Sequence, residues 1–263
     1  MTDVLAISSR DNPRLALVRR LCKDPAAYRK AGQVWLEGDH LLRACVQRGW
    51  SLQEVLVAET AWQQLAMREL AAHARRAIRV PDALFNELSA LQSPAAIGAL
   101  IDVPAAAPIL AGVATVLLDR LQDAGNVGSI LRSASALGVR QVLALQGTAA
   151  LWSPKVLRAA MGAHFGLHLS EGLHIDDLSA LQLPWVATSS HAVTVLHEAR
   201  LPTPCVWVFG HEGQGIAQAL LRRCAMTVRI AQPGGEESLN VAAAAAICLH
   251  EGLRQQLAGT AGQ

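Results

Sequence analysis

Five side chains able to take part in catalysis lie at three places where a predicted strand leads through a loop into a predicted helix. A guanidinium, a carboxylate, two carboxamides and a hydroxyl can hold a polar substrate by hydrogen bonds and stabilise negative charge that develops on an oxygen atom. Parallel α/β sheets bind ligands at the carboxyl ends of their strands. The residues at these strand ends that we take as candidates are Asn126, Arg132, Glu212, Ser238 and Asn240.

The first of these places opens a predicted helix. An apolar stripe at helical spacing runs from Val127 to Ala134. Asn126 stands where it would cap this helix, and Arg132 lies beside the stripe. Taken alone, these residues are better explained as a helix cap and a solvated arginine than by a catalytic role.

The second and third places are a glycine loop and the start of an alanine-rich helix. Glu212 lies among three glycines in Phe209–Gly215, and glycine lets a backbone approach a ligand closely. The loop lacks the last glycine of the dinucleotide fingerprint, so it does not indicate an NAD site. Ser238 could serve only as the N-cap of the helix predicted over residues 239–257, whose thin alanine face allows another backbone to come close.

Composition excludes several classes of protein. The chain has 263 residues, of which 52% are hydrophobic and 17% charged, and this argues against disorder. No apolar run approaches the roughly 18–20 residues of a membrane span, and the first residues lack a signal peptide's apolar stretch, so we expect a cytoplasmic protein without a membrane partner. The five cysteines include no CxxC pair, which excludes a disulfide framework and a cysteine-based zinc site, and we expect no metal.

The chain reads as α/β throughout, in two domains. A proline-containing stretch without helical or strand period separates them, so we expect a smaller α/β domain over 1–102, a linker over 103–112 and a second domain over 113–263. Near-continuous apolar strands in the second domain indicate a parallel sheet covered on both faces. Strands are expected at 34–37, 54–57, 77–80, 97–101, 114–119, 141–145, 185–189, 205–210 and 226–230, and helices at 12–21, 40–48, 62–75, 127–137, 216–223 and 239–257.

Together and in this order, the three places resemble the motifs of the SpoU (TrmH-type) RNA ribose 2′-O-methyltransferases of the SPOUT superfamily. Those motifs run as Asn-Val-Gly…Arg at a helix start, then Phe-Gly-x-Glu-Gly-x-Gly, then Glu-Ser-Leu-Asn-Val, and all three lie within 113–257. The segment from Trp152 to Ala163 also looks like the family. Ser9-Arg-Asp-Asn-Pro-Arg-Leu and Trp35-Leu-Glu-Gly are similar to the L30e-like RNA-binding extension of rRNA-directed members. Ser93-Pro-Ala-Ala-Ile-Gly departs from it, with two alanines where relatives usually carry glutamine and glycine.

The resemblance implies a fold, a cofactor and an assembly. It implies a deep trefoil knot in the C-terminal domain, S-adenosylmethionine as methyl donor, and a homodimer through the methyltransferase domain. The positions that match the family's cofactor-binding residues are Thr188, Ser189, Gly210, Ile230 and Leu239.

The chemistry so implied is an in-line transfer of a methyl group to a ribose hydroxyl, for which positioning alone can supply roughly 7–11 kcal/mol. By resemblance, Arg132 contacts the hydroxyl and an adjacent RNA phosphate, and Asn126 orients Arg132 or the nucleotide. Glu212, Ser238 and Asn240 would shape the site and hydrogen-bond within it. Because a guanidinium has a pKa above about 12, we expect Arg132 to stabilise the developing alkoxide rather than act as a base.

The substrate expected from the extra N-terminal domain is 23S rRNA. A tRNA methyltransferase, a self-resistance enzyme that also modifies rRNA, and a non-catalytic RNA-binding assembly factor on the same scaffold are the alternatives. Residues 1–48 hold nine Lys and Arg against five Asp and Glu, which suits phosphate binding, although a solvated helix face would show the same pattern. The predicted RNA-binding residues are Arg10, Arg14, Arg19, Arg20, Lys23, Lys155 and Arg158.

Overall fold

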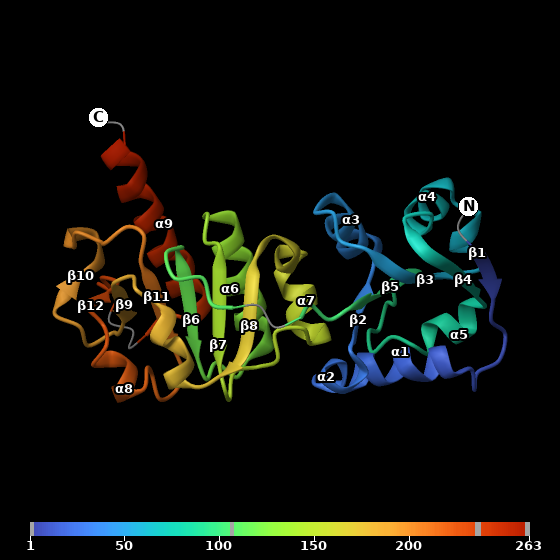
Figure 1. Ribbon diagram of the computed structural model, residues 1–263, viewed down its shortest axis with the longest axis horizontal. Coiled ribbons are helices and arrows are strands. Elements are labelled where there is room, and N and C mark those ends of the chain that lie inside the picture. Colours follow the sequence, from blue (N-terminus) through green and yellow to red (C-terminus); the bar gives the residue numbers. More distant parts are fainter. Residues whose placement is uncertain (1–2, 106–107, 235–237, 261–263) are drawn as a thin grey trace. The chain divides into compact units, whose positions relative to one another are not determined.

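A computed structural model describes residues 3–105, 108–234 and 238–260. The chain divides into two compact units, Met1–Ala105 with Trp152–Phe165, and Ala106–Leu151 with Gly166–Gln263 (Figure 1). The prediction for the second domain, 113–263, differs from this division in one segment, because residues 152–165 pack with the first unit.

An aromatic contact fixes that segment within the first unit. The indole Nε1 of Trp50 donates a hydrogen bond of 3.1 Å to the carbonyl oxygen of Phe165, and the two rings meet edge to face at 5.4 Å. Gly162 has φ +86°, and a Cβ there would lie 2.5 Å from the Cβ of Ala44. A close backbone approach that only glycine permits therefore helps to hold the segment.

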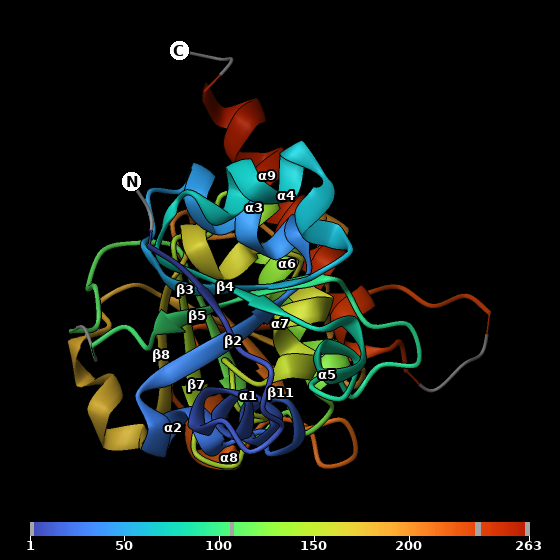
Figure 2. The same cartoon turned by 90° about the vertical axis from the view of Figure 1, so that its right-hand side faces the viewer.

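The first unit is a mixed five-stranded sheet in the order β1-β4-β3-β5-β2, with helices on both faces. The short helices α3 and α4 cover one face, and α1, α2 and α5 cover the other (Figures 1 and 2). Its strands are β1 (Asp3–Ala6), β2 (Gln33–Glu37), β3 (Leu52–Ala58), β4 (Ala74–Val80) and β5 (Ile97–Asp102). Its helices are α1 (Pro13–Lys23), α2 (Ala27–Ala31), α3 (Asp39–Gln47), α4 (Leu65–Ala71), α5 (Asp82–Asn86) and α7 (Pro154–Ala160), with a 3₁₀ turn at Ala61–Gln63.

The helix predicted over 62–75 is wrong at its C-terminal end, after Ala71. The α-helix there, α4, ends at Ala71, and β4 begins at Ala74. Ala77, Ile78 and Val80 are buried and pair in parallel with β3, so the residues before them join the same ladder. Strand pairing thus overrides the helical pattern of the sequence.

The second unit contains a seven-stranded sheet in the order β10-β12-β9-β11-β6-β7-β8, in which every registered pair is parallel. This confirms the predicted parallel sheet. Its strands are β6 (Thr115–Asp119), β7 (Gln141–Leu145), β8 (His168–Leu173), β9 (Trp185–Thr188), β10 (Thr194–Val195), β11 (Val206–Gly210) and β12 (Met226–Arg229). Its helices are α6 (Ala124–Ala136), α8 (Gln218–Leu221) and α9 (Val241–Thr260), with 3₁₀ turns η3 (Ile175–Ala180) and η4 (Leu196–Glu198).

Both faces of this sheet are covered, as its apolar strands predict. On one face Leu117 and Val208 pack in a buried cluster with Leu178 of η3 and Leu220 of α8. On the other face α6 packs against α9, and α9 contacts β11. Burial on both sides explains why β6, β7 and β11 are almost uninterrupted runs of apolar residues.

The five cysteines are free thiols, and four of them are buried. Burial raises the pKa of Cys45, Cys205 and Cys248 to about 12, so these thiols stay protonated and act as small core residues. Within the described ranges, no helix has both the length and the apolar character needed to cross a bilayer.

Candidate active site

The carboxyl ends of four neighbouring strands, β12, β9, β11 and β6, lie along one edge of the parallel sheet. Gly210, the last residue of β11, pairs in register with Asp119, the last residue of β6. The loops that contain the sequence motifs leave the sheet at this edge. The fold therefore brings together loops that are far apart in the sequence.

One hydrogen-bonded cluster at this edge joins a residue from each of the three motifs. The side chain Nδ2 of Asn126 donates to Glu212 Oε1 at 3.1 Å. The side chain Nδ2 of Asn240 donates to Asn126 Oδ1 at 3.0 Å. Because both polar atoms of the Asn126 side chain have partners, its carboxamide is held in one orientation.

Glu212 is the acceptor at the centre of the cluster. Its carboxylate also accepts from the backbone N–H groups of Gln122 and Asp123, each at 3.3 Å. Burial favours the neutral carboxyl, but hydrogen bonds from its own backbone N–H, from Asn126 and from these two amides outweigh it and lower the pKa of Glu212. Glu212 is therefore a carboxylate at neutral pH and binds the loop after β6 to the glycine loop.

The predicted role of Asn126 as a helix cap is wrong. Helix α6 begins at Ala124, and Asp123 is its N-cap, accepting from the backbone N–H of Asn126 at 2.9 Å. An aspartate three residues earlier satisfies the helix N-terminus, so the side chain of Asn126 remains available for Glu212 and Asn240.

Asn240, not Ser238, caps the last helix. Its Oδ1 accepts from the backbone N–H groups of Ala242 and Ala243, at 2.9 and 3.3 Å. One carboxamide therefore caps α9 with its oxygen and holds Asn126 with its nitrogen. Ser238 is exposed and forms no hydrogen bond with the described residues.

Arg132 lies apart from this cluster. It is exposed on α6, six residues after Asn126 and on a different face of the helix. Within the described part of the chain it has no ion pair or hydrogen bond. The side chain of Asn126 thus binds Glu212 and Asn240, and it forms no hydrogen bond with the guanidinium of Arg132.

The predicted cofactor residues lie at the same edge. Thr188 ends β9, Gly210 ends β11, and Ile230 follows β12 directly. The hydroxyl of Thr188 donates to the carbonyl oxygen of Val208 at 3.3 Å, and the backbone N–H of Ser189 donates to that of Val228 at 3.0 Å. Leu239, with 40% of its surface exposed, precedes α9.

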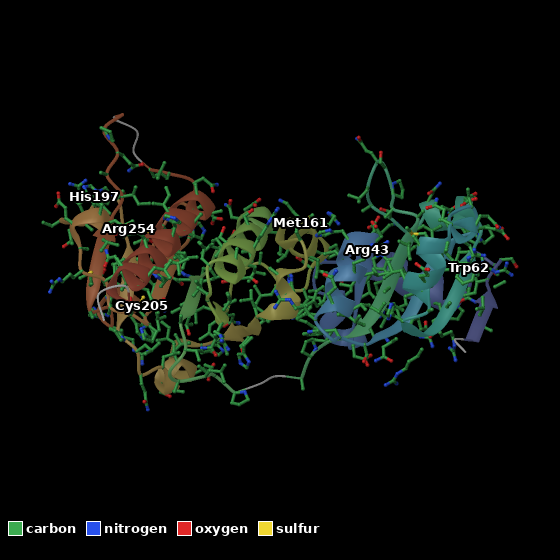
Figure 3. The ribbon with its side chains drawn as sticks, turned by 90° about the horizontal axis from the view of Figure 1, so that it is seen from above. Arg43, Trp62, Met161, His197, Cys205 and Arg254 are labelled. Atoms are coloured by element: carbon green, nitrogen blue, oxygen red, sulfur yellow. The ribbon has the colours of Figure 1, made fainter. Side chains whose placement is uncertain are left out.

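A cavity of about 420 Å³ adjoins this edge. It lies between η4, the residues after β12 and the middle of α9, and Ile230 is the one predicted cofactor residue in its lining. Figure 3 shows His197, which lines it, at the same end of the second unit as Arg254. Arg254 forms a bidentate pair with Glu251 of the lining, at 2.7 and 2.8 Å.

Two residues that the sequence did not single out complete the edge. Asp119 is buried, and its Oδ2 accepts from the backbone N–H of Ala217 at 2.7 Å. Arg120 donates to both carboxylate oxygens of Asp119, at 2.7 and 3.1 Å, and this hydrogen bonding raises the pKa of Arg120. An adjacent Asp-Arg pair at a predicted strand end was the signal that could have found them.

The seven predicted RNA-binding residues all belong to the first unit. Arg14 lies 3.2 Å from Glu54, while Arg10 and Arg19 lie 2.8 and 4.0 Å from Glu87. The other four are the exposed Arg20, Lys23 and Lys155 and the half-buried Arg158.

The described residues hold no group of three or more His, Cys, Asp or Glu side chains that could bind a metal ion. An edge of a parallel sheet that presents carboxamides, a carboxylate and a glycine loop suits a transferase that positions a polar substrate.

Comparison with known proteins defines the class. Residues 114–250 match the SpoU rRNA methylase family, and residues 7–99 match the MRM3-like substrate binding domain. The protein belongs to the SpoU rRNA methylase family.

Relatives at similar length support this assignment. The chain is 31% identical to a protein of Synechocystis sp. named as a tRNA/rRNA methyltransferase, over 98% of this chain and 97% of that one. It is 28% identical to the 23S rRNA (uridine(2479)-2′-O)-methyltransferase of Streptomyces viridochromogenes, over 88% and 85% of the two chains. It is 27% identical to the 23S rRNA (guanosine(2553)-2′-O)-methyltransferase of Bacillus subtilis, over 84% and 88%.

A solved structure confirms the predicted fold class. The SpoU methyltransferase AviRb from Streptomyces viridochromogenes, crystallised with AdoMet, superposes with a TM-score of 0.85 at 26% identity, over 94% of this chain and 98% of that one. The α/β architecture with a parallel C-terminal sheet and a smaller N-terminal domain is therefore shared. The trefoil knot stays a prediction from the resemblance.

Proposed function

We propose that the protein transfers a methyl group from S-adenosylmethionine to the 2′-hydroxyl of a ribose in 23S rRNA. The observation that carries this function is the cluster of Asn126, Glu212 and Asn240, because it unites the three family motifs at the ligand-binding edge of the sheet. Membership of the SpoU family and the likeness to named 23S rRNA 2′-O-methyltransferases support the reaction and the substrate.

The residues at the edge fit the cofactor. Gln232 has a buried side-chain oxygen without a hydrogen-bond partner among the described residues, and it stands between Ile230 and Leu239 in the sequence. An unsatisfied buried acceptor is costly unless a ligand or water supplies a donor. Backbone groups at the strand ends and the exposed apolar side chain of Leu239 would hold the adenosine part. When bound, the cofactor supplies an activated methyl group on a sulfonium.

The protein's part in the reaction is to orient and to stabilise charge. Asn126, held from both sides, would fix the ribose with a carboxamide that cannot rotate freely. Glu212 keeps Asn126 in place and stays ionised at neutral pH because its pKa is lowered. Arg132 would stabilise the oxygen as its proton leaves to water or to an RNA phosphate, since a guanidinium does not accept a proton at this pH.

Assembly as a homodimer and a cytoplasmic location are part of the proposal. Helix α9 carries Ile247 and Leu257 with 41% and 61% of their surfaces exposed, and a second copy that covered them would bury apolar area. Light scattering of the pure protein tests the dimer, and Leu257→Glu should shift it toward monomer.

Transfer of labelled methyl groups tests the function. Unmodified 23S rRNA, large ribosomal particles and tRNA are incubated in parallel with S-adenosylmethionine labelled in its methyl group, and the product is checked for ribose that resists alkaline cleavage. We expect label in 23S rRNA or its particle, and none with Arg132→Ala. Label confined to tRNA would overturn the substrate, and wild-type protein without label in any RNA would overturn the reaction.

A further inference from the structure

Arg120 joins three loops that follow neighbouring strands. Its guanidinium donates to both carboxylate oxygens of Asp119 at the end of β6. Its Nη1 also donates to the side-chain oxygen of Gln214 in the glycine loop after β11, at 3.1 Å. Its backbone N–H donates to the hydroxyl of Thr148 in the loop after β7, also at 3.1 Å. One residue therefore links the loops that follow β6, β7 and β11.

The backbone of Arg120 is strained. Its φ is +60°, a left-handed conformation that costs a non-glycine residue about 1 kcal/mol or more. Its side chain also passes close to Gly147, where a Cβ would lie 3.2 Å from Arg120 Cγ. A strained backbone persists only where surrounding contacts stabilise it, and here the hydrogen bonds from Arg120 to the buried carboxylate of Asp119 do so.

Besides the hydrogen bonds within it, between His211 and Gly213, Gln214 and Gly215, the glycine loop is held to neighbouring segments at three points. Ala217, just beyond it, donates to Asp119, and Glu212 accepts from the loop after β6. Gln214 is the third point, two residues from Glu212, and its partner is Arg120. The loop around Gln214 is exposed and contains three glycines, so its backbone could adopt many conformations if it made no contacts. Each of the three contacts reduces that number.

We propose that Arg120 is a positioning residue for methyl transfer: through Gln214 it holds the glycine loop so that Glu212 stays on Asn126. This proposal rests on the proposed function, because it holds that a fixed Asn126 carboxamide speeds methyl transfer. Arg120 acts through Glu212 and touches neither the ribose nor the methyl group.

Variants at Gln214 test this proposal and leave Arg120 in place as the partner of the buried Asp119 carboxylate. Gln214→Ala deletes the contact, Gln214→Glu replaces it with an ion pair, and Gln214→Lys sets two cations against each other. Gln218→Ala, an exposed glutamine on α8 with no hydrogen bond from its side chain among the described residues, is the matched control. Amide hydrogen exchange of residues 210–217 measures the mobility of the loop directly. Steady-state kinetics with 23S rRNA measure how that mobility affects methyl transfer.

We expect Gln214→Ala and Gln214→Lys to speed amide exchange in the loop and to lower kcat by about fivefold or more, with KM for RNA unchanged. Gln214→Glu should restore both readings to within about twofold of wild type. In a Glu212→Gln background, Gln214→Ala should cost much less, because its effect passes through Glu212.

Amide exchange in Gln214→Ala that matches Gln218→Ala would overturn the inference whatever the activity. Faster exchange with an unchanged kcat would overturn the link to catalysis. Wild-type protein that methylates no RNA would instead contradict the proposed function, while the exchange data would still decide whether Arg120 holds the loop.

Discussion

The side chain of Asn240 donates a hydrogen bond of 3.0 Å to the side chain of Asn126, which lies 114 residues earlier in the chain. Asn240 also caps α9 with its other polar atom. The start of the last helix and the first turn of α6 are therefore fixed to each other through two carboxamides. This contact makes Asn126 part of a rigid site instead of a mobile surface residue.

The two roles of Asn240 can be separated by one substitution. Asn240→Asp keeps an oxygen to cap α9 but loses the amide that donates to Asn126. We expect thermal stability within a few degrees of wild type and a rate of methyl transfer lower by about tenfold. Melting curves and single-turnover assays measure the two effects, and Asn240→Ala, which loses both roles, should lower both values.

Gly210 and Gly213 should respond differently to alanine, although they share one loop. A Cβ at Gly210 would overlap the backbone of Gly215 and Ile216, whereas a Cβ at Gly213 would meet only the ring of His211, at 3.8 Å. We expect Gly210→Ala to cost about 1–3 kcal/mol and to abolish transfer, and Gly213→Ala to leave both nearly unchanged. Denaturant unfolding and activity check this, and equal effects would contradict it.

The basic residues of α1 should divide into two groups in RNA binding. Arg14 is engaged with the buried Glu54, whereas Arg20 and Lys23 are exposed and form no ion pair within the described ranges. We expect the double variant Arg20→Ala, Lys23→Ala to weaken RNA binding and to reduce its salt dependence by about two phosphate contacts. Arg14→Ala should lower stability more than affinity. Filter binding at several salt concentrations separates the two outcomes.

Glu251 should make stability depend on pH in acid. Hydrogen bonds from Arg254, against an opposing effect of burial, lower the pKa of Glu251 to about 2 from 4.5. Its contribution is therefore complete above pH 4.5 and is lost as the pH falls toward 2. We expect Glu251→Gln to lower the melting temperature at neutral pH and to flatten its decline over this acid range. Melting temperatures that decline in parallel with falling pH in the wild type and in Glu251→Gln would contradict this.

Much of the second unit could be predicted from apolar runs. β7 was predicted at its observed bounds, and β6, β9, β11 and β12 to within one residue at each end, because buried parallel strands are continuously apolar. β1 and β8 were missed. Both lie at sheet edges and are largely exposed or half-buried, so they lack the long buried apolar run that marks the central strands.

Of the five residues predicted to form the site, Asn126, Glu212 and Asn240 lie in one hydrogen-bonded cluster, and their contacts could not be predicted from the sequence. Asn126 looked like a cap because it precedes the apolar stripe, whereas Asp123 takes that place. The Asp119–Arg120 pair was missed, because its importance depends on Gln214, 94 residues away from Arg120, which only folding brings near. Spacing identifies residue types at strand ends, while partners across the sheet depend on strand order.

Asn126→Ala tests the central claim most directly, in single-turnover methyl transfer to 23S rRNA. The substitution removes the carboxamide that joins Glu212 to Asn240 and leaves Asp123 to cap α6. We predict a melting temperature and cofactor affinity close to wild type and a rate lower by about a hundredfold. A rate within about threefold of wild type would show that this cluster is not the centre of catalysis.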